Sequence, residues 1–330
     1  MTFSTLFDSN YLSRGIAMYE SLSERCSNFK LYIFPFDEKA FAVLEAMKLP
    51  NVELVHLSEL ESDDLLRVKP TRSRAEYCWT CTSSSILFLL EKRGLPSCTY
   101  LDADLYFYDS PQVLFHELDR GSVLITGHRY SPEYDLSAVS GIYCVQFITF
   151  RNDEPGLRVL KWWRDACVDW CYSRLEDGKF GDQKYLDDWS YRFAGVNVLQ
   201  HLGGGVAPWN VQQYRLRTEE RKLRGVERAT HRAFDVVFYH FHYVRHYRNG
   251  KIDLGDYRIE KEVIDLLYKP YLRHLESIKN RIRHIDDSFD PHGPRPMYAE
   301  WRTPLIHLRR RYLNRFNIYK PSEVLGKSNH

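Results

Sequence analysis

The chain has 330 residues, of which 44% are hydrophobic and 15% aromatic, so it can bury a large core. The net charge of +2 gives no overall field that would favour nucleic acid as a partner. The opening MTFSTLFD lacks the basic segment of a secretory signal, and no hydrophobic run is long enough to span a membrane. Seven scattered cysteines, with Cys78 and Cys81 as a lone C-x-x-C pair, indicate reduced thiols rather than a zinc site, so we expect a cytoplasmic protein.

The first hundred residues alternate between strand-like and helix-like segments. Apolar and β-branched runs predict strands, and three-to-four-residue spacing predicts helices. We expect strands at 3–7, 30–34, 52–56 and 99–101, and helices at 13–23, 38–47 and 75–90. This order predicts an α/β fold with a mostly parallel central sheet and flanking helices. Ligands of such sheets bind beyond the carboxyl ends of strands, which is where Asp8 and the pair Asp102 and Asp104 are placed.

The segment from Thr99 to Asp109 carries the strongest functional signal. Asp102 and Asp104 follow a strand and are two residues apart, so both side chains point to the same side of an extended chain. Two carboxylates can hold one Mg²⁺ or Mn²⁺ without enclosing it, which leaves room for water and substrate phosphates. A nucleotide diphosphate is held in this way. The alternative is a solvated turn, but the strands on both sides favour the metal site.

The middle of the chain contains further predicted strands and one long helix. Strands are expected at 123–126, 143–150 and 196–199, and a helix at 156–172 whose tryptophans belong to the core. The run from Gly203 to Gly205 predicts a flexible turn, since no phosphate-loop or dinucleotide spacing accompanies it. A later strand, 236–242, places His240 and His242 on one face. They are either satisfied polar residues or metal ligands, and an imidazole ligand suits Mn²⁺ better than Mg²⁺.

Several of these segments, in this order, resemble glycosyltransferase family 8, which has the GT-A fold. The matching segments are 5–15, Asp102-x-Asp104, Asp182-Gln183, Trp209-Asn210-x-Gln212 and His240-Phe241-His242. Residues 3–245 are more closely similar to bacterial glycosyltransferases from surface-polysaccharide gene clusters. The chain departs from the family at its end, because Tyr243 stands where the family has glycine and the Lys-Pro-Trp group is absent. The diphosphate contacts of that loop are therefore in question.

The resemblance implies a metal-dependent, retaining hexosyltransferase that moves a sugar from a nucleotide diphosphate donor, with UDP favoured, to a glycan or lipid-linked acceptor. It implies that Mn²⁺ or Mg²⁺ binds to Asp102, Asp104 and His240, with His242 as the other imidazole. The donor would also contact Asp8, Asn10, Tyr11, Trp209 and Asn210. Asp182 and Gln183 would lie beside the reacting sugar as the catalytic residues.

The C-terminal region differs from the rest, so we expect a transferase domain at 1–256 and a helical extension at 257–330. Residues 258–330 hold 15 Lys and Arg against 9 Asp and Glu, a net charge of +6. Hydrophobic spacing predicts one helix at 264–285 and, after a proline-rich break at 290–296, a second at 304–318 that carries Arg309, Arg310 and Arg311. This tail either docks on the catalytic core or attaches to the anionic inner face of the membrane.

Other interpretations remain open from the sequence. A phosphohydrolase would use Asp102 as nucleophile, but its motif has threonine where this chain has Tyr106. A sugar-binding or assembly protein could also use the same scaffold without catalysis. The basic residues Lys69, Arg72 and Arg74 predict a solvated loop, with a phosphate cradle as the alternative.

Overall fold

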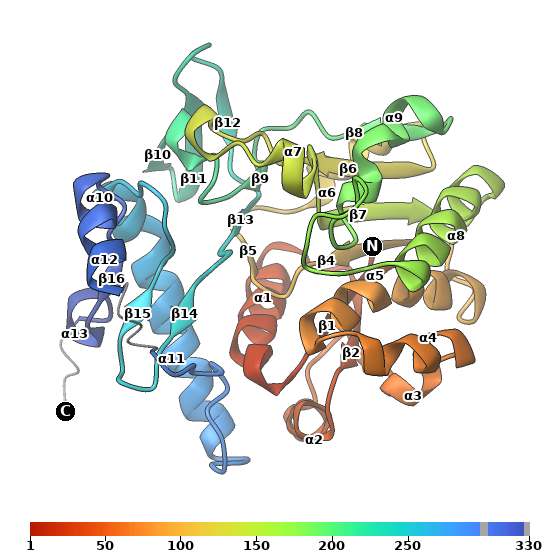
Figure 1. The fold of residues 1–330 in the computed structure, drawn as a ribbon, viewed down its shortest axis with the longest axis horizontal. Coiled ribbons are helices and arrows are strands. Elements are labelled where there is room, and N and C mark those ends of the chain that lie inside the picture. Colours follow the sequence, from red (N-terminus) through yellow and green to blue (C-terminus); the bar gives the residue numbers. More distant parts are fainter. Residues whose placement is uncertain (298–302, 327–330) are drawn as a thin grey trace.

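The computed structural model describes residues 1–297 and 303–326. At its centre lies a sheet with the strand order β3-β2-β1-β4-β7-β6-β8 (Figure 1). Strand β7 pairs antiparallel with β4 and β6, and the other neighbours pair in parallel. The strands are β1 Thr2–Phe7, β2 Lys30–Pro35, β3 Val52–Leu54, β4 Ser97–Leu101, β6 Val123–Gly127, β7 Tyr143–Arg151 and β8 Val196–Val198. The predicted α/β fold with a mostly parallel sheet is confirmed.

Helices cover both faces of this sheet. Along β2, Leu31 and Ile33 belong to one hydrophobic cluster and Tyr32 and Phe34 to the other, as alternation along a strand requires. Helices α1 and α2 pack in the first cluster, and α5 and α8 in the second. The helices are α1 Leu12–Arg25, α2 Glu38–Met47, α3 Leu57–Leu60, α4 Asp63–Val68, α5 Arg74–Glu91, α6 Gln112–Phe115, α7 Ser137–Ser140, α8 Glu154–Asp169 and α9 Trp189–Arg192.

A second, three-stranded sheet lies at the carboxyl edge of the first. Strand β13, Phe238–His240, pairs antiparallel with β5, Leu105–Phe107, and parallel with β9, Gly204–Val206. Asp102 and Asp104 occupy the short connection between β4 and β5, so they lie where the two sheets meet. The second sheet therefore brings the late histidine strand against the aspartate pair.

The glycine run 203–205 is not the flexible turn predicted from the sequence. It is buried, and its last two residues begin β9. A Cβ atom on Gly203 would lie 1.9 Å from the carbonyl oxygen of Asp235, and one on Gly204 would lie 2.6 Å from a methyl group of Leu199. Glycine is required here because neighbouring chain segments approach too closely for any side chain.

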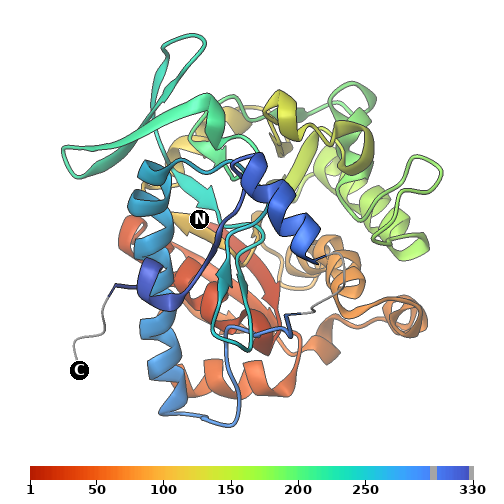
Figure 2. The ribbon, with the colours of Figure 1, turned by 60° about the vertical axis from the view of Figure 1, so that its left-hand side comes forward.

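A further sheet was not predicted. Strands β10 Tyr214–Glu219, β11 Lys222–Glu227 and β12 Ala233–Asp235 form an antiparallel sheet that extends from the body of the molecule (Figure 2). Its strands carry several exposed charged residues, so their hydrophobic alternation is weak.

The C-terminal region packs against the rest of the chain. Helix α10, Lys261–Val263, continues through a π-helical turn at Ile264–Tyr268 into α11, Lys269–Arg283, which packs on α1, so the first predicted C-terminal helix is confirmed. The second predicted helix is shorter than expected: α12 spans Thr303–Tyr312. The chain then adds β16, Ile318–Tyr319, to the hairpin of β14, Arg245–His246, and β15, Ile252–Asp253, and ends in α13, Pro321–Val324. Among the described residues, no helix is long and apolar enough to cross a membrane.

Candidate active site

Asp102, Asp104 and His240 converge at the junction of the two sheets. The imidazole Nε2 of His240 lies 3.0 Å from Oδ1 of Asp104 and 3.7 Å from Oδ2 of Asp102. Backbone bonds fix all three: Asp102 N–H donates to the carbonyl of Gln146, and Phe241 N–H donates to the carbonyl of Asp104, at 3.0 and 2.9 Å. The predicted group of two carboxylates and one imidazole is thus present, on a scaffold of paired strands.

Gln146 on β7 orients the imidazole of His240. Its Oε1 lies 2.8 Å from Nδ1 of His240, inside the protein. An Nδ1–H that donates to this oxygen leaves the lone pair of Nε2 directed at the carboxylates, the arrangement found around metal-binding histidines. The sequence analysis did not identify Gln146, although an amide in the middle of an apolar strand was a usable signal.

The two histidines are not equivalent. His240 is buried and contacts both carboxylates, whereas His242 is exposed and has no carboxylate partner among the described residues. The His242 ring centroid lies 5.6 Å from that of His240. His240 is therefore the better candidate ligand, and His242 lies at the rim of the same group.

The charges of this group are strongly coupled. Burial would raise the pKa of Asp104, but the adjacent His240 lowers it to about 2. Burial opposes the charged form of His240, yet the carboxylate of Asp104 raises the pKa of His240 well above its usual value. Burial raises the pKa of Asp102 to about 6. An added cation would relieve the repulsion between the two carboxylates.

The donor set fits a hard divalent cation. Two carboxylates and one oriented imidazole from adjacent strand ends leave other coordination positions for water or phosphate oxygens. The thiol of Cys144 also lies near Asp102 and His240. Burial raises the pKa of Cys144, so it stays a thiol and is a poor ligand for Mg²⁺ or Mn²⁺. These residues would hold the cation that the sequence predicted.

Asp182 comes from another part of the chain and joins Asp102 and Asp104 in one acidic region, called the crevice. Its backbone carbonyl accepts a 2.8 Å bond from the indole N–H of Trp163 on α8, so a core tryptophan positions it. Burial, together with the charge of Asp102, raises the pKa of Asp182 to about 7. The half-buried Gln183 follows directly, before a 3₁₀ turn at Lys184–Asp188. Asp182 therefore lies within electrostatic reach of Asp102, and Gln183 follows it in the chain.

The first loop lies on the other side of this group. Oδ1 of Asp8 accepts bonds from the backbone N–H groups of Asn10 and Tyr11, at 2.9 and 3.2 Å, and so shapes the turn before α1. The charges of Asp8, Asp102 and Asp182 all act on the thiol of Cys78, whose pKa burial raises well above its usual value. The three carboxylates therefore all lie close to Cys78, and Asp8 belongs to the same acidic region.

The basic residues in 69–74 differ in exposure: Lys69 and Arg74 are exposed, and Arg72 is buried. Lys69 pairs with Glu61 at 2.6 Å, and the guanidinium of Arg72 lies 3.9 Å from the ring centroid of Tyr172. Arg74 pairs with Asp8 at 2.6 Å and also with Asp37. The solvated interpretation therefore holds for the exposed Lys69 and Arg74 and is wrong for the buried Arg72, while the phosphate cradle stays a prediction.

Trp209 and Asn210 lie in the protein interior next to the candidate site. Both are buried, and the Trp209 ring lies 5.2 Å from that of His240. The Asn210 amide donates to the carbonyls of His128 and Gly205 and accepts from Ala207 N–H, each at 2.9 Å. These bonds hold Asn210 against the β9 region, and its predicted contact with the donor stays a prediction.

Tyr243 adopts a backbone conformation that favours glycine. Its φ of 72° lies in the left-handed region, which costs a bulky residue free energy. Its ring packs 3.7 Å from the guanidinium of Arg245. The loop thus keeps a glycine-like path while adding an aromatic and a basic side chain next to the site.

A second group of possible ligands, His246, Glu276 and His292, lies beneath this loop. The two imidazoles are stacked, with centroids 4.3 Å apart and planes at 22°. Nearly parallel rings cannot both direct a nitrogen lone pair at one cation. His292 instead bonds to Ser13 at 2.8 Å and Glu276 at 3.2 Å, so the cluster anchors the C-terminal segment to α1 and α11.

Comparisons with known proteins identify relatives of the chain and of its fold. No protein-family model matches the chain. The structure resembles the galactosyltransferase LgtC, solved in complex with donor and acceptor sugar analogues, with a TM-score of 0.53 and 11% identity over 84% of this chain and 96% of LgtC. An active-site mutant of LgtC matches over the same shares, with a TM-score of 0.51 and 11% identity. The protein therefore has the GT-A fold of glycosyltransferases, as the resemblance implied.

Two relatives come from Bacillus subtilis (strain 168), and both are named as uncharacterized proteins. YfnD is 28% identical over 299 residues, which cover 88% of this chain and 94% of YfnD. YfnF is 30% identical over 247 residues, which cover 72% of this chain and 80% of YfnF. At this identity and coverage, the chain belongs to the same protein family as YfnF.

Proposed function

We propose that this protein is a glycosyltransferase that moves a sugar from a nucleotide diphosphate donor to a hydroxyl group of an acceptor. One observation carries the proposal: Asp102, Asp104 and His240 meet at the carboxyl edge of a GT-A sheet, with Gln146 orienting the imidazole. Structural similarity to LgtC supports the same function class.

In this proposal, the residues of the crevice have different roles. Asp102, Asp104 and His240 hold Mn²⁺ or Mg²⁺, which as a Lewis acid would stabilise negative charge on the leaving diphosphate. Asp8, Asn10 and Tyr11 border the nucleotide. Asp182, with a pKa of about 7, is both a hydrogen-bond donor and an acceptor at neutral pH, so it can hold the acceptor or donor sugar hydroxyls beside Gln183.

The test is release of nucleotide diphosphate from a panel of UDP-, GDP- and TDP-sugars with MnCl₂. We expect turnover with at least one donor, its loss in EDTA, and its loss in Asp102→Asn and Asp104→Asn. Asp109→Asn is the matched control, because Asp109 lies in the same segment but pairs with Lys222 outside the crevice. Full activity in EDTA or in both variants would rule out the metal site. Release of inorganic phosphate would indicate a phosphohydrolase, and no release at all a binding protein.

We further propose UDP as the donor nucleotide, retention of the anomeric configuration, and a role in bacterial surface-polysaccharide synthesis on glycan or lipid-linked acceptors. The order of family-8-like segments supports these finer assignments. An α-linked donor should give an α-linked product, which NMR of the anomeric proton can measure. A β-linked product would contradict retention and would require a general base, for which Asp182 is the first candidate.

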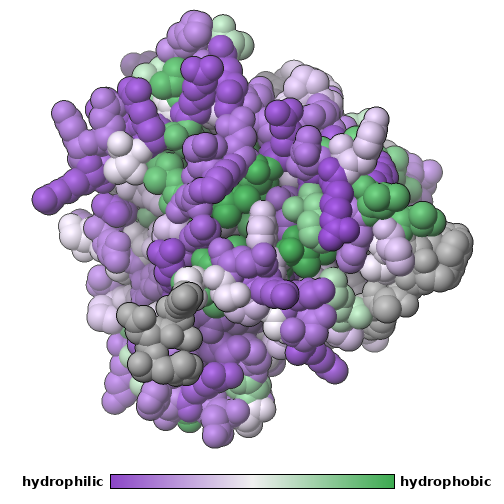
Figure 3. All heavy atoms as spheres, turned by 90° about the vertical axis from the view of Figure 1, so that its left-hand side faces the viewer, coloured by the Kyte–Doolittle hydropathy of each residue, from purple (hydrophilic) through white to green (hydrophobic). Residues whose placement is uncertain are grey.

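We propose that residues 1–256 form the transferase domain and that 257–330 dock on it, because α11 packs on α1 and Arg310 forms an ion pair with Asp253. Arg310 is buried, so it cannot bind lipid as the sequence suggested. Three large side chains of α12 are nevertheless exposed, Leu305, Leu308 and Tyr312, by 61, 64 and 86%. Figure 3 shows hydrophobic residues among hydrophilic ones on the side of the molecule where α12 lies.

Arg309 and Arg311 lie on the same helix, which supports peripheral attachment of a cytoplasmic enzyme to an anionic leaflet. Binding to phosphatidylglycerol vesicles should be weakened by salt and by Arg309→Gln/Arg311→Gln. The pair Arg221→Gln/Arg232→Gln, on the exposed β10–β12 region, is the control. Equal binding of both double variants and the unchanged protein would rule out attachment through α12.

A further inference from the structure

The C-terminal segment 288–297 crosses the first loop of the chain. Ser13 N–H donates to the carbonyl of Pro291 at 3.3 Å, and the Arg14 guanidinium donates to the carbonyl of His292 at 3.1 Å. Gly293, with a φ of 60°, lies so close that a Cβ there would be 2.5 Å from Cβ of Asn10. The segment is therefore held directly against the loop that borders the proposed nucleotide site.

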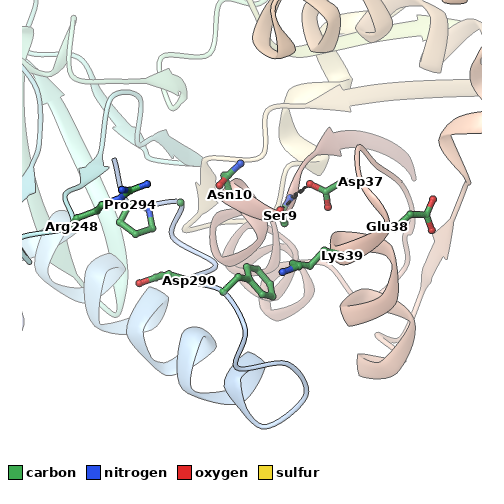
Figure 4. Close-up of a pocket in the computed structure, with 10 residues that line it drawn as sticks. Ser9, Asn10, Asp37, Glu38, Lys39, Arg248, Asp290 and Pro294 are labelled. Carbon is green, nitrogen blue, oxygen red and sulfur yellow. Dashed lines mark hydrogen bonds between the residues drawn. The ribbon is translucent and has the colours of Figure 1, made fainter. Parts of the chain in front are cut away.

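A cavity of about 650 Å³ opens between this segment and the loop (Figure 4). Ser9 and Asn10 line it from the loop, and Phe289, Asp290 and Pro294 line it from the C-terminal segment. A residue range outside the predicted transferase domain thus forms one wall of the space next to Asn10.

Two arginines lie beside this wall. Arg295 is fixed next to β14, because its N–H donates to the carbonyl of His246 at 2.9 Å and its carbonyl accepts from Arg248 N–H at 3.0 Å. Arg245 on β14 packs on the ring of Tyr243. Neither guanidinium has a carboxylate partner within the described part of the chain. Burial raises the pKa of Tyr11, and the charges of Asp104, Arg295 and Arg245 act on the same hydroxyl.

The crevice needs such cations. Asp102, Asp104 and Asp182 make it acidic, and a nucleotide diphosphate adds further negative charge. Two other nearby arginines are already engaged: Arg14 is buried and donates to backbone carbonyls, and Arg74 pairs with Asp8 and Asp37. Arg248 lines the cavity and has no carboxylate partner among the described residues, but only Arg245 and Arg295 are seen to act on the hydroxyl of Tyr11. Arg245 and Arg295 are therefore the described cations best placed to meet the phosphates.

We infer that Arg245 and Arg295 bind the diphosphate of the donor. This inference rests on the proposed function and deepens it. A guanidinium offers paired N–H groups that match phosphate oxygens, so these side chains supply the contacts that the missing lysine loop does not. It also means that the donor site includes residue 295, beyond the expected domain boundary at 256.

The test is calorimetric titration of the full-length chain with UDP and UMP, and with GDP and GMP, in MnCl₂. We expect Arg245→Gln and Arg295→Gln each to weaken binding of the diphosphate about 10-fold or more, and binding of the monophosphate much less. Arg245→Lys and Arg295→Lys keep the charge and should recover part of the loss. Arg283→Gln, an exposed arginine in the last turn of α11, is the matched control and should bind as the unchanged protein does.

Two results would overturn the inference. If the unchanged protein binds diphosphates but both glutamine variants keep the same preference for diphosphate over monophosphate, the arginine assignment is wrong while the proposed function stands. If the unchanged protein binds none of the four nucleotides, nor TDP, the proposed function itself fails. Thermal melts of each variant establish that it is folded, and the lysine variants decide the matter where a glutamine variant does not fold.

Discussion

Replacing Arg310 tests how the C-terminal segment is held. Its guanidinium makes two parallel bonds to the carboxylate of Asp253, at 3.0 and 2.8 Å, and the two side chains are 8 and 2% exposed. Arg310→Gln leaves the Asp253 carboxylate buried without a counter-charge. Breaking a buried pair in this way costs about 3–5 kcal/mol of unfolding free energy. With an unfolding entropy of about 2.1 cal/mol/K per residue, or about 0.7 kcal/mol/K for the 330 residues, Tm should fall by about 4–7 °C.

Differential scanning calorimetry measures this shift. Arg309→Gln is the control, because Arg309 is exposed and its replacement should change Tm by less than about 1 °C. Arg310→Leu/Asp253→Leu should recover much of the loss, because both charges leave together. Local release of α12 without global unfolding would instead speed chymotrypsin cleavage after Tyr312. An unchanged Tm together with unchanged cleavage would refute the reasoning.

Three further outcomes follow from individual contacts. Gln146→Leu should weaken Mn²⁺ binding about 10- to 100-fold in a calorimetric titration, because His240 loses the group that orients it. Gly203→Ala should lower the unfolding free energy by at least about 1–3 kcal/mol in urea, whereas Gly127→Ala, with only ordinary contacts, should not. Burial lowers the pKa of His128 to about 3, so the unfolded chain takes up its proton first as the pH falls. The free energy of unfolding should therefore fall as the pH drops below about 6.5, by up to about 1.4 kcal/mol per pH unit. In urea titrations, His128→Asn should make this fall less steep.

The fold could be predicted because its signals are local. The α2 boundaries, Glu38–Met47, match the expectation, since a capping aspartate and hydrophobic spacing lie within the segment itself. The β10–β12 sheet was missed because its strands are largely exposed and charged. The buried path of Gly203 was also missed, because only the distant Asp235 carbonyl explains why glycine is needed there.

Part of the candidate site could likewise be predicted from local patterns, and part could not. Alternation along extended strands predicted the two pairs, but Asp102 and Asp104 lie in the turn between β4 and β5, and His242 lies beyond the end of β13. Which histidine meets the carboxylates depends on how β13 pairs with β5, which the sequence does not state. Gln146 contacts His240, about 90 residues away in the chain, and Arg295 contacts His246, about 50 residues away. No local pattern therefore indicated either residue.

Asp102 and Asp182 differ in pKa because their charged neighbours differ, whereas burial raises the pKa of both. His240 lies against Asp102 and favours its ionised form, while Asp182 has no cationic partner among the described residues and experiences the charge of Asp102. The proton therefore stays longest on Asp182, whose pKa is about 7. The site thus keeps its charged carboxylates beside the imidazole and adds, at Asp182, a carboxyl that is half protonated at neutral pH. Carboxylates with separated pKa values suit ion binding by one part of the site and hydrogen bonding to sugar hydroxyls by the other.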